Sequence, residues 1–458
     1  MFTQVELDKV IKAYDVRGLV DGQITPTFAF ALGAATARFL NEEKEPDSIV
    51  IGEDMRPSSD SLATAFADGV TSQGTDAIRI GLASTDMLYF ASGSLNLPGA
   101  MFTASHNPAA YNGVKLCKSG ARPIGSESGL LDIKQLMVTG LSKSRGAVGR
   151  ITHKDMLSEY VDFLLGVFAE NEFSTGRKLK LVVDAGNGMA GYTAPAIMER
   201  LNIELVPMYF ELDGNFPNHE ANPIDPKNLV DLRARVVEEK ADLGLAFDGD
   251  ADRCFLIDEN GEPINPSALT ALIAIRELKR KPASTVIYNL ISSQAVPEII
   301  LEHGGTPLRS RVGHSYIKKM MAESGAIFGG EHSGHFYFTD FWRADSGALA
   351  ALFAIAELSH ATVPMSQLLA PLNRYVSSGE INTVVRDTQE SIRFIKSTYS
   401  HGDNQYGLDE LDGITVTGPD WWFNVRPSNT EPLLRLNVEA QTLERMTEIR
   451  DQVLAHFG

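Results

Sequence analysis

Residues 241–250 read ADLGLAFDGD and carry the pattern that decides the fold. An apolar run of strand length ends in a turn of Gly and Asp, which is typical of a buried strand in a layered α/β protein. The same pattern recurs in residues 47–52 (DSIVIG), 76–81 (DAIRIG), 179–188 (LKLVVDAGNG) and 284–290 (STVIYNL). Helical patterns such as SDSLATAFADGVTSQG and ALTALIAIRELK follow several of these runs. Strands that alternate with helices predict α/β domains with ligands at the strand ends.

The chain of 458 residues is long enough for several domains. The strand–helix pattern recurs in three blocks, and the C-terminal part is shorter-patterned, with WWFNVRPSNTEPLLRLNVEA predicting two strands around a loop. We expect the domains to pack closely, with a ligand in a cleft between them. The predicted domains are residues 1–150, 151–256, 257–370 and 371–458.

The composition excludes some classes of function. The formal net charge of −18 argues against a broad nucleic-acid-binding surface. No apolar run is long enough to span a bilayer, and the first residues lack a signal-peptide pattern. Cys117 and Cys254 are too few for a disulfide framework, which fits a reducing compartment. We therefore expect a cytoplasmic protein that binds small molecules, without nucleic acid or membrane partners; monomer and dimer stay equally open.

The stretch FDGDADR places three carboxylates, Asp248, Asp250 and Asp252, directly after the apolar run. Carboxylates this close repel one another unless a cation lies among them, and hard oxygen ligands suit Mg²⁺. Arg253 follows at once and can reach an anion next to the metal. The alternative is an acidic surface turn that is merely solvated, and the pattern alone does not decide between the two.

Residues 102–115 read FTASHNPAAYNGVK and combine Ser105, a histidine, amides and Lys115. A serine needs an activating group to act as a nucleophile. The Gly-x-Ser-x-Gly pattern of lipase-like hydrolases is absent here, and an acidic loop elsewhere favours phosphoryl chemistry. Lys115 then holds an anion or moves a proton. The alternative is an ordinary loop serine beside a histidine.

Two further loops offer groups for a phosphorylated sugar. RPSNTEPLLR, beginning at Arg426, has the composition to bind a tetrahedral dianion, although it also fits a polar hairpin turn. GGEHSGHFYF places Glu331 and Ser333 in a glycine-rich loop suited to sugar hydroxyls. A zinc site at His332 and His335 lacks an obvious third ligand.

Taken together, these motifs resemble those of the α-D-phosphohexomutase superfamily. They occur in the order of that family and cover nearly the full chain. The four loops that match are TASHNP (residues 103–108), DGDADR (248–253), GEHSGH (330–335) and RPSNTEP (426–432). Further landmarks are YDVRG (14–18), DAGNGMAG (184–191) and DGNFPNHEANP (213–223).

The resemblance implies a heart-shaped fold of four domains around a central cleft: three related mixed α/β domains and a smaller C-terminal α+β domain. It implies that Ser105 carries the phosphoryl group and binds Mg²⁺ together with Asp248, Asp250 and Asp252. The other catalytic residues that it implies are Arg17, His106, Arg253, His314 and, as general acid and base, Lys115. The implied substrate-binding residues are Glu331, Ser333 and His335 for the sugar, and Arg426, Ser428, Asn429 and Thr430 for the phosphate that is not transferred.

The implied reaction is the reversible isomerisation of a hexose 6-phosphate and a hexose 1-phosphate through a hexose 1,6-bisphosphate, which is also the activator. GEHSGH and RPSNTEP look most like the bacterial phosphomannomutase/phosphoglucomutase branch, so we expect mannose phosphate as substrate. Glucose phosphate, alone or in dual use, is the alternative. Phosphoglucosamine is disfavoured because that branch usually has Gly where Asn429 stands. A silent sugar-phosphate-binding relative and a metal-dependent phosphatase are the other readings.

One departure concerns the third predicted domain. Many relatives carry a lysine early in that domain, whereas the similar stretch here, VIYNLISSQAV, has none. Asn289, Ser292 and Ser293 are the candidates to replace its contact with the substrate, and the sequence does not choose among them.

Overall fold

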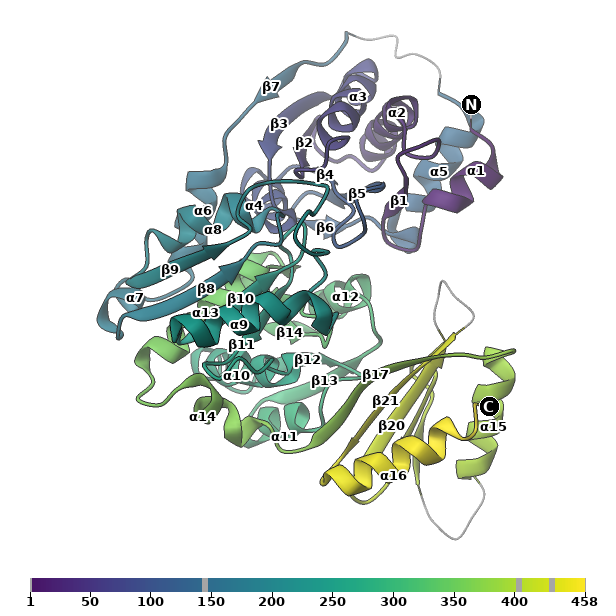
Figure 1. Ribbon diagram of the computed structural model, residues 1–458. Helices are drawn as coiled ribbons and strands as arrows, with labels where there is room; N and C mark the ends of the chain where they lie inside the picture. Colours follow the sequence, from purple (N-terminus) through teal and green to yellow (C-terminus); the bar gives the residue numbers. More distant parts are fainter. Residues whose placement is uncertain (1, 142–146, 401–405, 428–432, 458) are drawn as a thin grey trace. The chain divides into compact units, whose positions relative to one another are not determined.

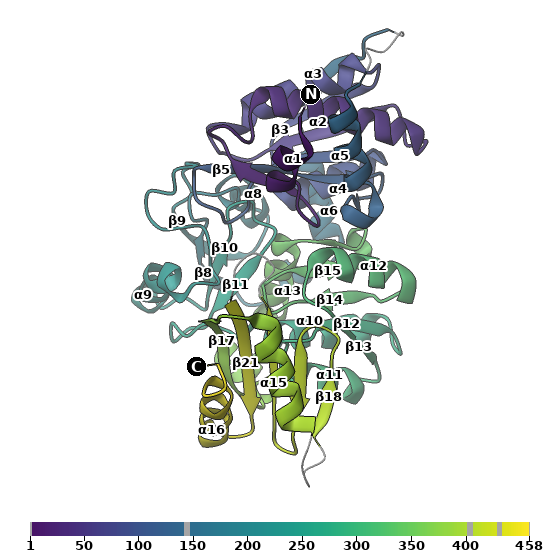
Figure 2. The same ribbon diagram turned by 90° about the vertical axis from the view of Figure 1, so that its right-hand side faces the viewer.

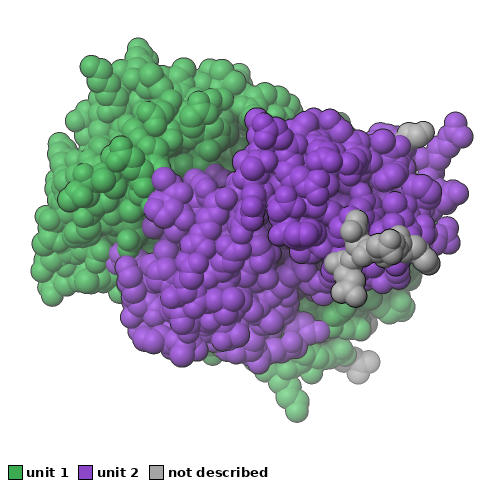
Figure 3. Space-filling view, turned by 90° about the horizontal axis from the view of Figure 1, so that it is seen from below, with its two compact units in different colours: residues 1–264, 333–368 green, residues 265–332, 369–458 purple. Residues whose placement is uncertain are grey.

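The computed structural model describes residues 2–141, 147–400, 406–427 and 433–457. It divides into two compact units (Figure 3): unit 1 consists of residues 1–264 and 333–368, and unit 2 of residues 265–332 and 369–458. This division is coarser than the four predicted domains, whose boundaries therefore stay predictions.

The N-terminal part of unit 1 is built on a mixed sheet with the strand order β1-β5-β4-β2-β3-β7 and β6 beside β5 (Figure 1). The strands β2, β3, β4 and β7 are parallel, whereas β5 runs antiparallel to β1, β4 and β6. Their bounds are β1 (Val16–Leu19), β2 (Ser48–Glu53), β3 (Asp76–Leu82), β4 (Gly99–Phe102), β5 (Tyr111–Lys118), β6 (Arg122–Pro123) and β7 (Ile151–His153).

Helices cover this sheet and close one core with β2, β4 and β5. Thr25 begins α2 by accepting a hydrogen bond from the Phe28 N–H, with Pro26 as the first helical residue. The helices α2 and α3 lie side by side because Gly33 has no side chain: a Cβ there would lie 2.2 Å from the Phe66 carbonyl oxygen. The helices are α1 (Gln4–Val10), α2 (Pro26–Glu42), α3 (Ser59–Ser72), α4 (Thr85–Leu95), the turn η1 (Ser126–Ser128) and α5 (Leu130–Thr139).

A second sheet of unit 1 has the strand order β11-β10-β8-β9. The strands β10, β8 and β9 are parallel, and β11 is antiparallel to β10. The predicted strands at 179–188 and 241–250 are β8 and β10, and each ends in the Gly/Asp turn that the sequence placed there. The strands are β8 (Leu179–Asp184), β9 (Ile203–Met208), β10 (Leu243–Phe247) and β11 (Cys254–Ile257); the helices are α6 (Leu157–Gly166), α7 (Glu172–Thr175), α8 (Ala190–Met198), η2 (Pro226–Leu229) and α9 (Val230–Glu239).

The segment 333–368 completes unit 1. The strands β15 (Phe336–Phe338) and β16 (Ala344–Asp345) pair antiparallel around η3 (Thr339–Phe341), and Ser346 then begins α13 (Gly347–His360). Nearly every residue of α13 is buried. Within the described residues no single helix is long and apolar enough to cross a membrane; by length and composition alone, the bent pair Gly347–His360 with Met365–Leu372 passes.

Unit 2 contains two different arrangements of strands. The first has β12 (Thr285–Asn289) between β13 (Thr306–Ser310) and β14 (Phe328–Gly330), all parallel. Its helices include the predicted helix at 268–279, which extends from 266 to 280. They are α10 (Pro266–Arg280), α11 (Ala295–Glu302) and α12 (His314–Ser324). The helix α14 (Met365–Leu369) and the turn η4 (Ala370–Leu372) lead to the second arrangement.

The C-terminal sheet is fully antiparallel, in the order β17-β21-β20-β19-β18, and α15 and α16 share its core (Figure 2). The two strands predicted in WWFNVRPSNTEPLLRLNVEA are β20 and β21. The bounds are β17 (Val376–Val384), α15 (Thr388–Ser400), β18 (Gly407–Asp409), β19 (Ile414–Thr417), β20 (Trp421–Pro427), β21 (Leu433–Ala440) and α16 (Leu443–Leu454). The predicted class, α/β with a C-terminal α+β part, is confirmed.

Candidate active site

Ser105 lies in the turn between β4 and β5, in the segment 103–108 that we call the Ser105 loop. Its φ of 49° is left-handed, a conformation that costs energy for a residue other than glycine and is frequent at functional sites. The Ser105 N–H donates to the Thr103 hydroxyl at 2.9 Å, which fixes the turn. The strained, buried backbone therefore restricts the direction in which the Ser105 side chain can point.

Arg56, which the sequence analysis did not identify, holds the backbone of this loop in place. Its guanidinium is fully buried, and its two terminal nitrogens donate to four backbone carbonyl oxygens at 2.7–3.1 Å. Those oxygens belong to Ser105, Asn107, Pro108 and Tyr111. The third nitrogen, Nε, donates to Asp54 at 3.1 Å. Arginine alone among side chains offers five donors in a fixed plane, so a single residue shapes the whole loop.

The three predicted metal ligands form the acid loop, residues 248–252, between β10 and β11. Asp248, Asp250 and Asp252 are all buried. Burial, with the charges of Asp252 and Asp250, raises the pKa of Asp248 to about 7 although Arg253 opposes the shift. Gly249 brings this loop against Ser105, since a Cβ there would lie 2.4 Å from the Ser105 carbonyl oxygen.

The Ser105 hydroxyl donates to Asp248 Oδ2 at 2.7 Å and lies 3.2 Å from His106 Nδ1. Arg253 donates to the same Asp248 oxygen through Nε at 2.9 Å and to His106 Nδ1 through Nη2 at 2.5 Å. Burial, followed by the charges of Arg253 and Arg17, holds the pKa of His106 well below its usual range, so the imidazole is neutral. The structure therefore brings together four of the predicted site residues: Ser105, His106, Arg253 and Asp248.

Arg17, on β1, reaches the Ser105 loop rather than Ser105 itself. It donates to Asn107 Oδ1 at 2.7 Å and to Asp15 at 2.6 Å. Its Nε is buried and donates no hydrogen bond. The guanidinium thus lies at the edge of the loop with spare donor capacity for an anion.

Lys115, on β5, points into the acid loop. Its ammonium donates to Asp250 Oδ2 at 2.7 Å and to Asp252 Oδ2 at 2.6 Å. Burial alone would lower the pKa of Lys115, but the two carboxylates raise it well above the usual value. The lysine is thus held protonated by the same groups that were predicted to hold a metal ion.

The carboxylates retain free capacity for a cation. Asp250 Oδ1 and Asp252 Oδ1 are buried and accept no hydrogen bond, and ligand atoms of all three aspartates lie within 4.8 Å of one another. The Thr85 hydroxyl and Lys115 both donate to Asp250 Oδ2, at 2.6 and 2.7 Å, so Oδ1 is the oxygen of this carboxylate that stays open to a cation. An uncompensated buried carboxylate oxygen is costly, so the acid loop fits a hard divalent cation.

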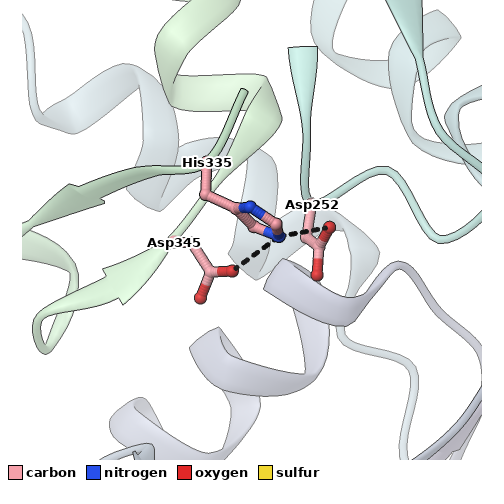
Figure 4. Close-up of side chains that lie close together, drawn as sticks. All are labelled: Asp252, His335 and Asp345. Atoms are coloured by element: carbon pink, nitrogen blue, oxygen red, sulfur yellow. Dashed lines mark ion pairs between the residues drawn. The ribbon is translucent and has the colours of Figure 1, made fainter. Parts of the chain in front are cut away.

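His335 lies beside the acid loop, between β14 and β15 (Figure 4). Its Nε2 is 3.6 Å from Asp252 Oδ1 and 3.9 Å from Asp345 Oδ2, and its Nδ1 is 2.9 Å from the Ser333 hydroxyl. Two residues predicted to bind sugar therefore contact each other next to the acid loop. Asp345 was missed by sequence reasoning because nothing local marks the two-residue strand β16 as part of a site.

The remaining predicted site residues, one catalytic and the others substrate-binding, belong to unit 2. Glu331 is buried, and its Oε1 accepts the Gly313 N–H at 3.1 Å. His314 begins α12, but its side chain is not among those described. Ser428, Asn429 and Thr430 lie outside the described residues.

Arg426, at the end of β20, is buried and faces a second arginine across the strand pair, Arg435 of β21. Glu380 of β17 accepts from Arg426 Nη2 at 2.5 Å and from Arg435 Nη1 at 3.2 Å. Both arginine Nε atoms are buried, and neither has a hydrogen-bond partner among the described residues. Glu380 was also missed by sequence reasoning, because only the register of β17 with β21 brings it here.

The three candidates for the missing lysine contact differ in accessibility. Asn289 and Ser292 are buried and bonded to each other, with the Ser292 hydroxyl donating to Asn289 Oδ1 at 2.8 Å. Ser293 is half-buried and accepts the Ala295 N–H at the start of α11. Its partial exposure makes Ser293 the most accessible of the three, and the substitution itself stays a prediction.

Four family models match the chain in consecutive segments. They are described as phosphoglucomutase/phosphomannomutase alpha/beta/alpha domains I, II and III, at residues 8–140, 158–261 and 265–375, and the C-terminal domain of the same family at 380–456. The chain belongs to this family. The predicted resemblance to the phosphohexomutases is thereby confirmed, together with the predicted class of enzyme, an isomerase that moves a phosphoryl group.

Individual relatives agree over the whole length. The chain is 37% identical to the phosphomannomutase of Escherichia coli K12, covering 97% of each chain, and 35% identical to the phosphomannomutase/phosphoglucomutase of Pseudomonas syringae, covering 97% of this chain and 94% of that one. A crystal structure of a phosphoglucomutase/phosphomannomutase family protein from Burkholderia thailandensis superposes with a TM-score of 0.88 at 30% identity, covering 99% of this chain and 97% of that chain.

Proposed function

We propose that the protein is a phosphomannomutase, which interconverts mannose 6-phosphate and mannose 1-phosphate through a phosphoserine at Ser105. The observation that carries the proposal is the contact of the Ser105 hydroxyl with Asp248, at 2.7 Å, at the edge of three buried carboxylates. A loop serine without function needs neither a strained backbone nor a cation site beside it. Relatives at 37% identity that bear the name phosphomannomutase support the sugar.

The reaction requires two balanced transfers. In the first, the bond from phosphorus to Ser105 Oγ breaks, a bond to a sugar hydroxyl oxygen forms, and the hydroxyl proton leaves to a base. In the second, the other phosphoryl group of the hexose 1,6-bisphosphate moves to Ser105 Oγ, and the released sugar oxygen takes up a proton. Positioning and charge stabilisation supply most of the catalysis of such transfers.

We assign residues of unit 1 to these steps from their hydrogen bonds and their protonation states. Protonated Lys115 is the donor for the sugar oxygen released in the second transfer. Arg253 and neutral His106, both within 3.4 Å of Ser105 Oγ, hold the transferring group in line. Asp248, Asp250 and Asp252 would hold Mg²⁺ together with the serine phosphate, and the ion would offset charge on the transferring phosphoryl group. Ser105, Lys115, His106, Arg17 and Arg253 thus stay our proposed catalytic residues, with His314.

The substrate needs a second, fixed anchor because one site must act on both ends of the sugar. Arg426, with its unpartnered buried Nε, is the charged part of that anchor, and Ser428, Asn429 and Thr430 are assigned to it by the RPSNTEP motif. Glu331, Ser333 and His335 offer donors and acceptors for hydroxyls. They must bind the sugar in two orientations. Contacts to hydroxyls allow this, because hydroxyls of the sugar can take similar positions in both orientations.

Glucose phosphate is a second candidate substrate, favoured by the name phosphomannomutase/phosphoglucomutase of the Pseudomonas syringae relative. Mannose and glucose differ only in configuration at C2. A difference confined to one hydroxyl is discriminated strongly only where a buried polar group is dedicated to it. Comparing kcat/KM for mannose, glucose and glucosamine 1-phosphates decides the preference.

The main test is incubation of the pure protein with mannose 1-phosphate, Mg²⁺ and a trace of hexose 1,6-bisphosphate. We expect mannose 6-phosphate to form, and expect Ser105→Ala to abolish its formation. Ser94→Ala, a change at an exposed serine of α4, is the matched control and should retain full activity. Release of inorganic phosphate without isomerised sugar would favour a phosphatase. No turnover by protein that carries phosphate on Ser105 would contradict the proposal.

A further inference from the structure

Asp252, His335 and Asp345 form a second cluster of metal-type ligands, which lies beside the acid loop (Figure 4). Asp252 comes from the acid loop, His335 from the segment before β15, and Asp345 from β16. One ligand atom from each lies within 4.8 Å of the other two. A zinc site at His332 and His335 lacked an obvious third ligand in the sequence, whereas the fold places two carboxylates next to His335.

The spacing suits a small ion after a modest contraction. His335 Nε2 lies 3.6 Å from Asp252 Oδ1 and 3.9 Å from Asp345 Oδ2. Tetrahedral zinc with bonds of about 2.0–2.2 Å places its ligand atoms roughly 3.3–3.6 Å apart. The His335 side chain is 20% exposed, against 1% for both aspartates, so the histidine side provides a path of entry and a place for a water ligand.

The oxygen that this cluster shares with the acid loop is open to a cation. Asp252 Oδ1 is buried and accepts no hydrogen bond, whereas Oδ2 of the same carboxylate is taken by Lys115 at 2.6 Å. This oxygen faces His335 Nε2 at 3.6 Å and lies 4.0 Å from Arg253 Nε, both beyond hydrogen-bond distance. A buried carboxylate oxygen that accepts no hydrogen bond costs stability, and an ion bound there would offset this cost.

The histidine is held in a way that suits a metal ligand. Its Nδ1 lies 2.9 Å from the Ser333 hydroxyl. When Nδ1–H donates to that hydroxyl, the Nε2 lone pair faces Asp252 and Asp345. A partner on the second nitrogen that fixes the ring is the usual support of a metal-bound histidine.

We propose that Asp252, His335 and Asp345 bind a borderline divalent cation such as Zn²⁺. An imidazole nitrogen favours Zn²⁺ or Co²⁺, whereas Mg²⁺ prefers oxygen alone. Because this site shares Asp252 with the acid loop, its occupant withdraws a carboxylate from the acid loop and immobilises His335. Zn²⁺ therefore inhibits the enzyme through a histidine-containing site and not only by exchange for another ion at the three aspartates.

The first test measures Co²⁺ binding in excess Mg²⁺, from the visible absorption of the bound ion. We expect His335→Gln and Asp345→Asn each to weaken binding by at least about tenfold. The matched control is His219→Gln, because His219 also faces a carboxylate, Asp184 at 2.9 Å, but outside this cluster. Equal affinity in His335→Gln and the unaltered protein, or an equal loss in His219→Gln, overturns the proposal.

The second test needs no variant and so does not depend on how a variant folds. Zinc-edge X-ray absorption is recorded on the unaltered protein with one equivalent of Zn²⁺ and excess Mg²⁺. We expect one imidazole nitrogen at about 2.0–2.1 Å, together with oxygen ligands. A shell of oxygen alone places the ion elsewhere and overturns the proposal. Both readouts are metal binding, so they stand or fall independently of the sugar that the enzyme uses.

Discussion

The Ser105 region of unit 1 and the Arg426 region of unit 2 are organised in opposite ways. Around Ser105, the described residues leave two buried acceptors without a hydrogen bond, Asp250 Oδ1 and Asp252 Oδ1, against one buried donor, Arg17 Nε. Around Arg426, one carboxylate, Glu380, serves two arginines, and within the described residues the buried Nε atoms of both lack a hydrogen-bond partner, so the unpaired groups of these three side chains are donors. Each region therefore lacks the charge that its expected ligand would bring: a cation would pair with the open oxygens of the first, and an anion with the open donors of the second.

The two regions also differ in how they are built. The Ser105 region consists of loops at strand ends, held by the buried Arg56 and by the approach of Gly249 to Ser105. The Arg426 region consists of strand residues, with Arg426 opposite Arg435 in the register of β20 and β21. Loops can set several side chains around one reacting atom, whereas paired strands give a rigid, flat row of charges. This difference fits chemistry in the first region and anchoring in the second.

The largest loss of activity and stability is expected when the buried carboxylates near Ser105 lose a hydrogen-bond donor. Lys115→Met removes the only ammonium seen on Asp250 and Asp252 within the described residues, so buried carboxylates lose their counter-ion. We expect activity to fall by about 10²–10⁴-fold and the free energy of unfolding without Mg²⁺ to fall by about 3–5 kcal/mol. Steady-state kinetics and urea unfolding, with and without Mg²⁺, measure both.

Lys118→Met is the matched control, because Lys118 is on the same strand but pairs with Glu43, whose side chain is 48% exposed. An exposed pair of this kind contributes about 0–1 kcal/mol. If Lys115→Met keeps activity within tenfold of the unaltered protein, Lys115 is not the proton donor of the reaction.

The second prediction concerns the rigidity of the Ser105 loop. Arg56→Lys keeps the positive charge but cannot donate to four carbonyl oxygens, so the loop should lose its single conformation. We expect kcat to fall by about 10²-fold with little change in KM, since a misplaced reacting group costs rate more than binding. Kinetics of transfer from labelled phosphoserine give the rate of the step directly.

Arg79→Lys provides the comparison for Arg56→Lys. Arg79, on β3, is another buried arginine and pairs with Glu53 at 2.6 Å. Its replacement should lower stability and leave kcat within threefold. Equal losses of kcat in both variants would mean that Arg56 acts only through the stability of the sheet.

Arg56 also marks the limit of what the sequence predicts. Ser105, Lys115 and the three aspartates were predicted because they lie in short motifs at strand ends that resemble those of a known family, and such motifs are visible in the chain. Arg56, Asp345 and Glu380 were not, because their roles depend on where a distant backbone passes or on strand register. A guanidinium that binds backbone carbonyl oxygens requires no particular side chains in the residues that it contacts, so no sequence pattern reveals the contact.

The third prediction uses pH to probe the helix behind the acid loop. Asp86 of α4 follows Thr85, and its carboxylate accepts from Tyr160 at 2.8 Å and Ser346 at 2.7 Å. Burial raises the pKa of Asp86 to about 6, although the hydrogen bonds of Ser346, Ser84 and Tyr160 oppose the shift.

Between about pH 4 and pH 6 the folded state therefore holds a proton on Asp86 that the unfolded state has released. Stability from this group is present below about pH 4 and is lost as the pH rises through 6. Relative to Asp86→Asn, the unaltered protein should lose about 2–3 kcal/mol of unfolding free energy between pH 4 and pH 7. Urea unfolding at several pH values measures the difference, and a constant difference would contradict the raised pKa.

The smallest effect tests the surplus of donors around Arg426. Glu380 binds the same guanidinium that a phosphate group would use, so the carboxylate competes with the substrate for Arg426. Glu380→Gln keeps the shape and removes the competing charge. We expect inorganic phosphate to bind about three- to tenfold more tightly and KM for the hexose phosphates to fall similarly, because losing one nearby like charge is worth roughly 1 kcal/mol in a partly exposed site. Calorimetry with inorganic phosphate measures the first quantity.

The matched control for Glu380→Gln is Glu410→Gln in the same unit, where the carboxylate pairs with Lys396 at an exposed position. It removes an equal charge and should leave phosphate affinity unchanged, which separates a local effect at Arg426 from a change in net charge. Weaker phosphate binding in Glu380→Gln would show instead that Glu380 orients the two arginines for the ligand. The same outcome would remove the contrast with the Ser105 region, because the Arg426 region would then be organised by its acceptor and not by a surplus of donors.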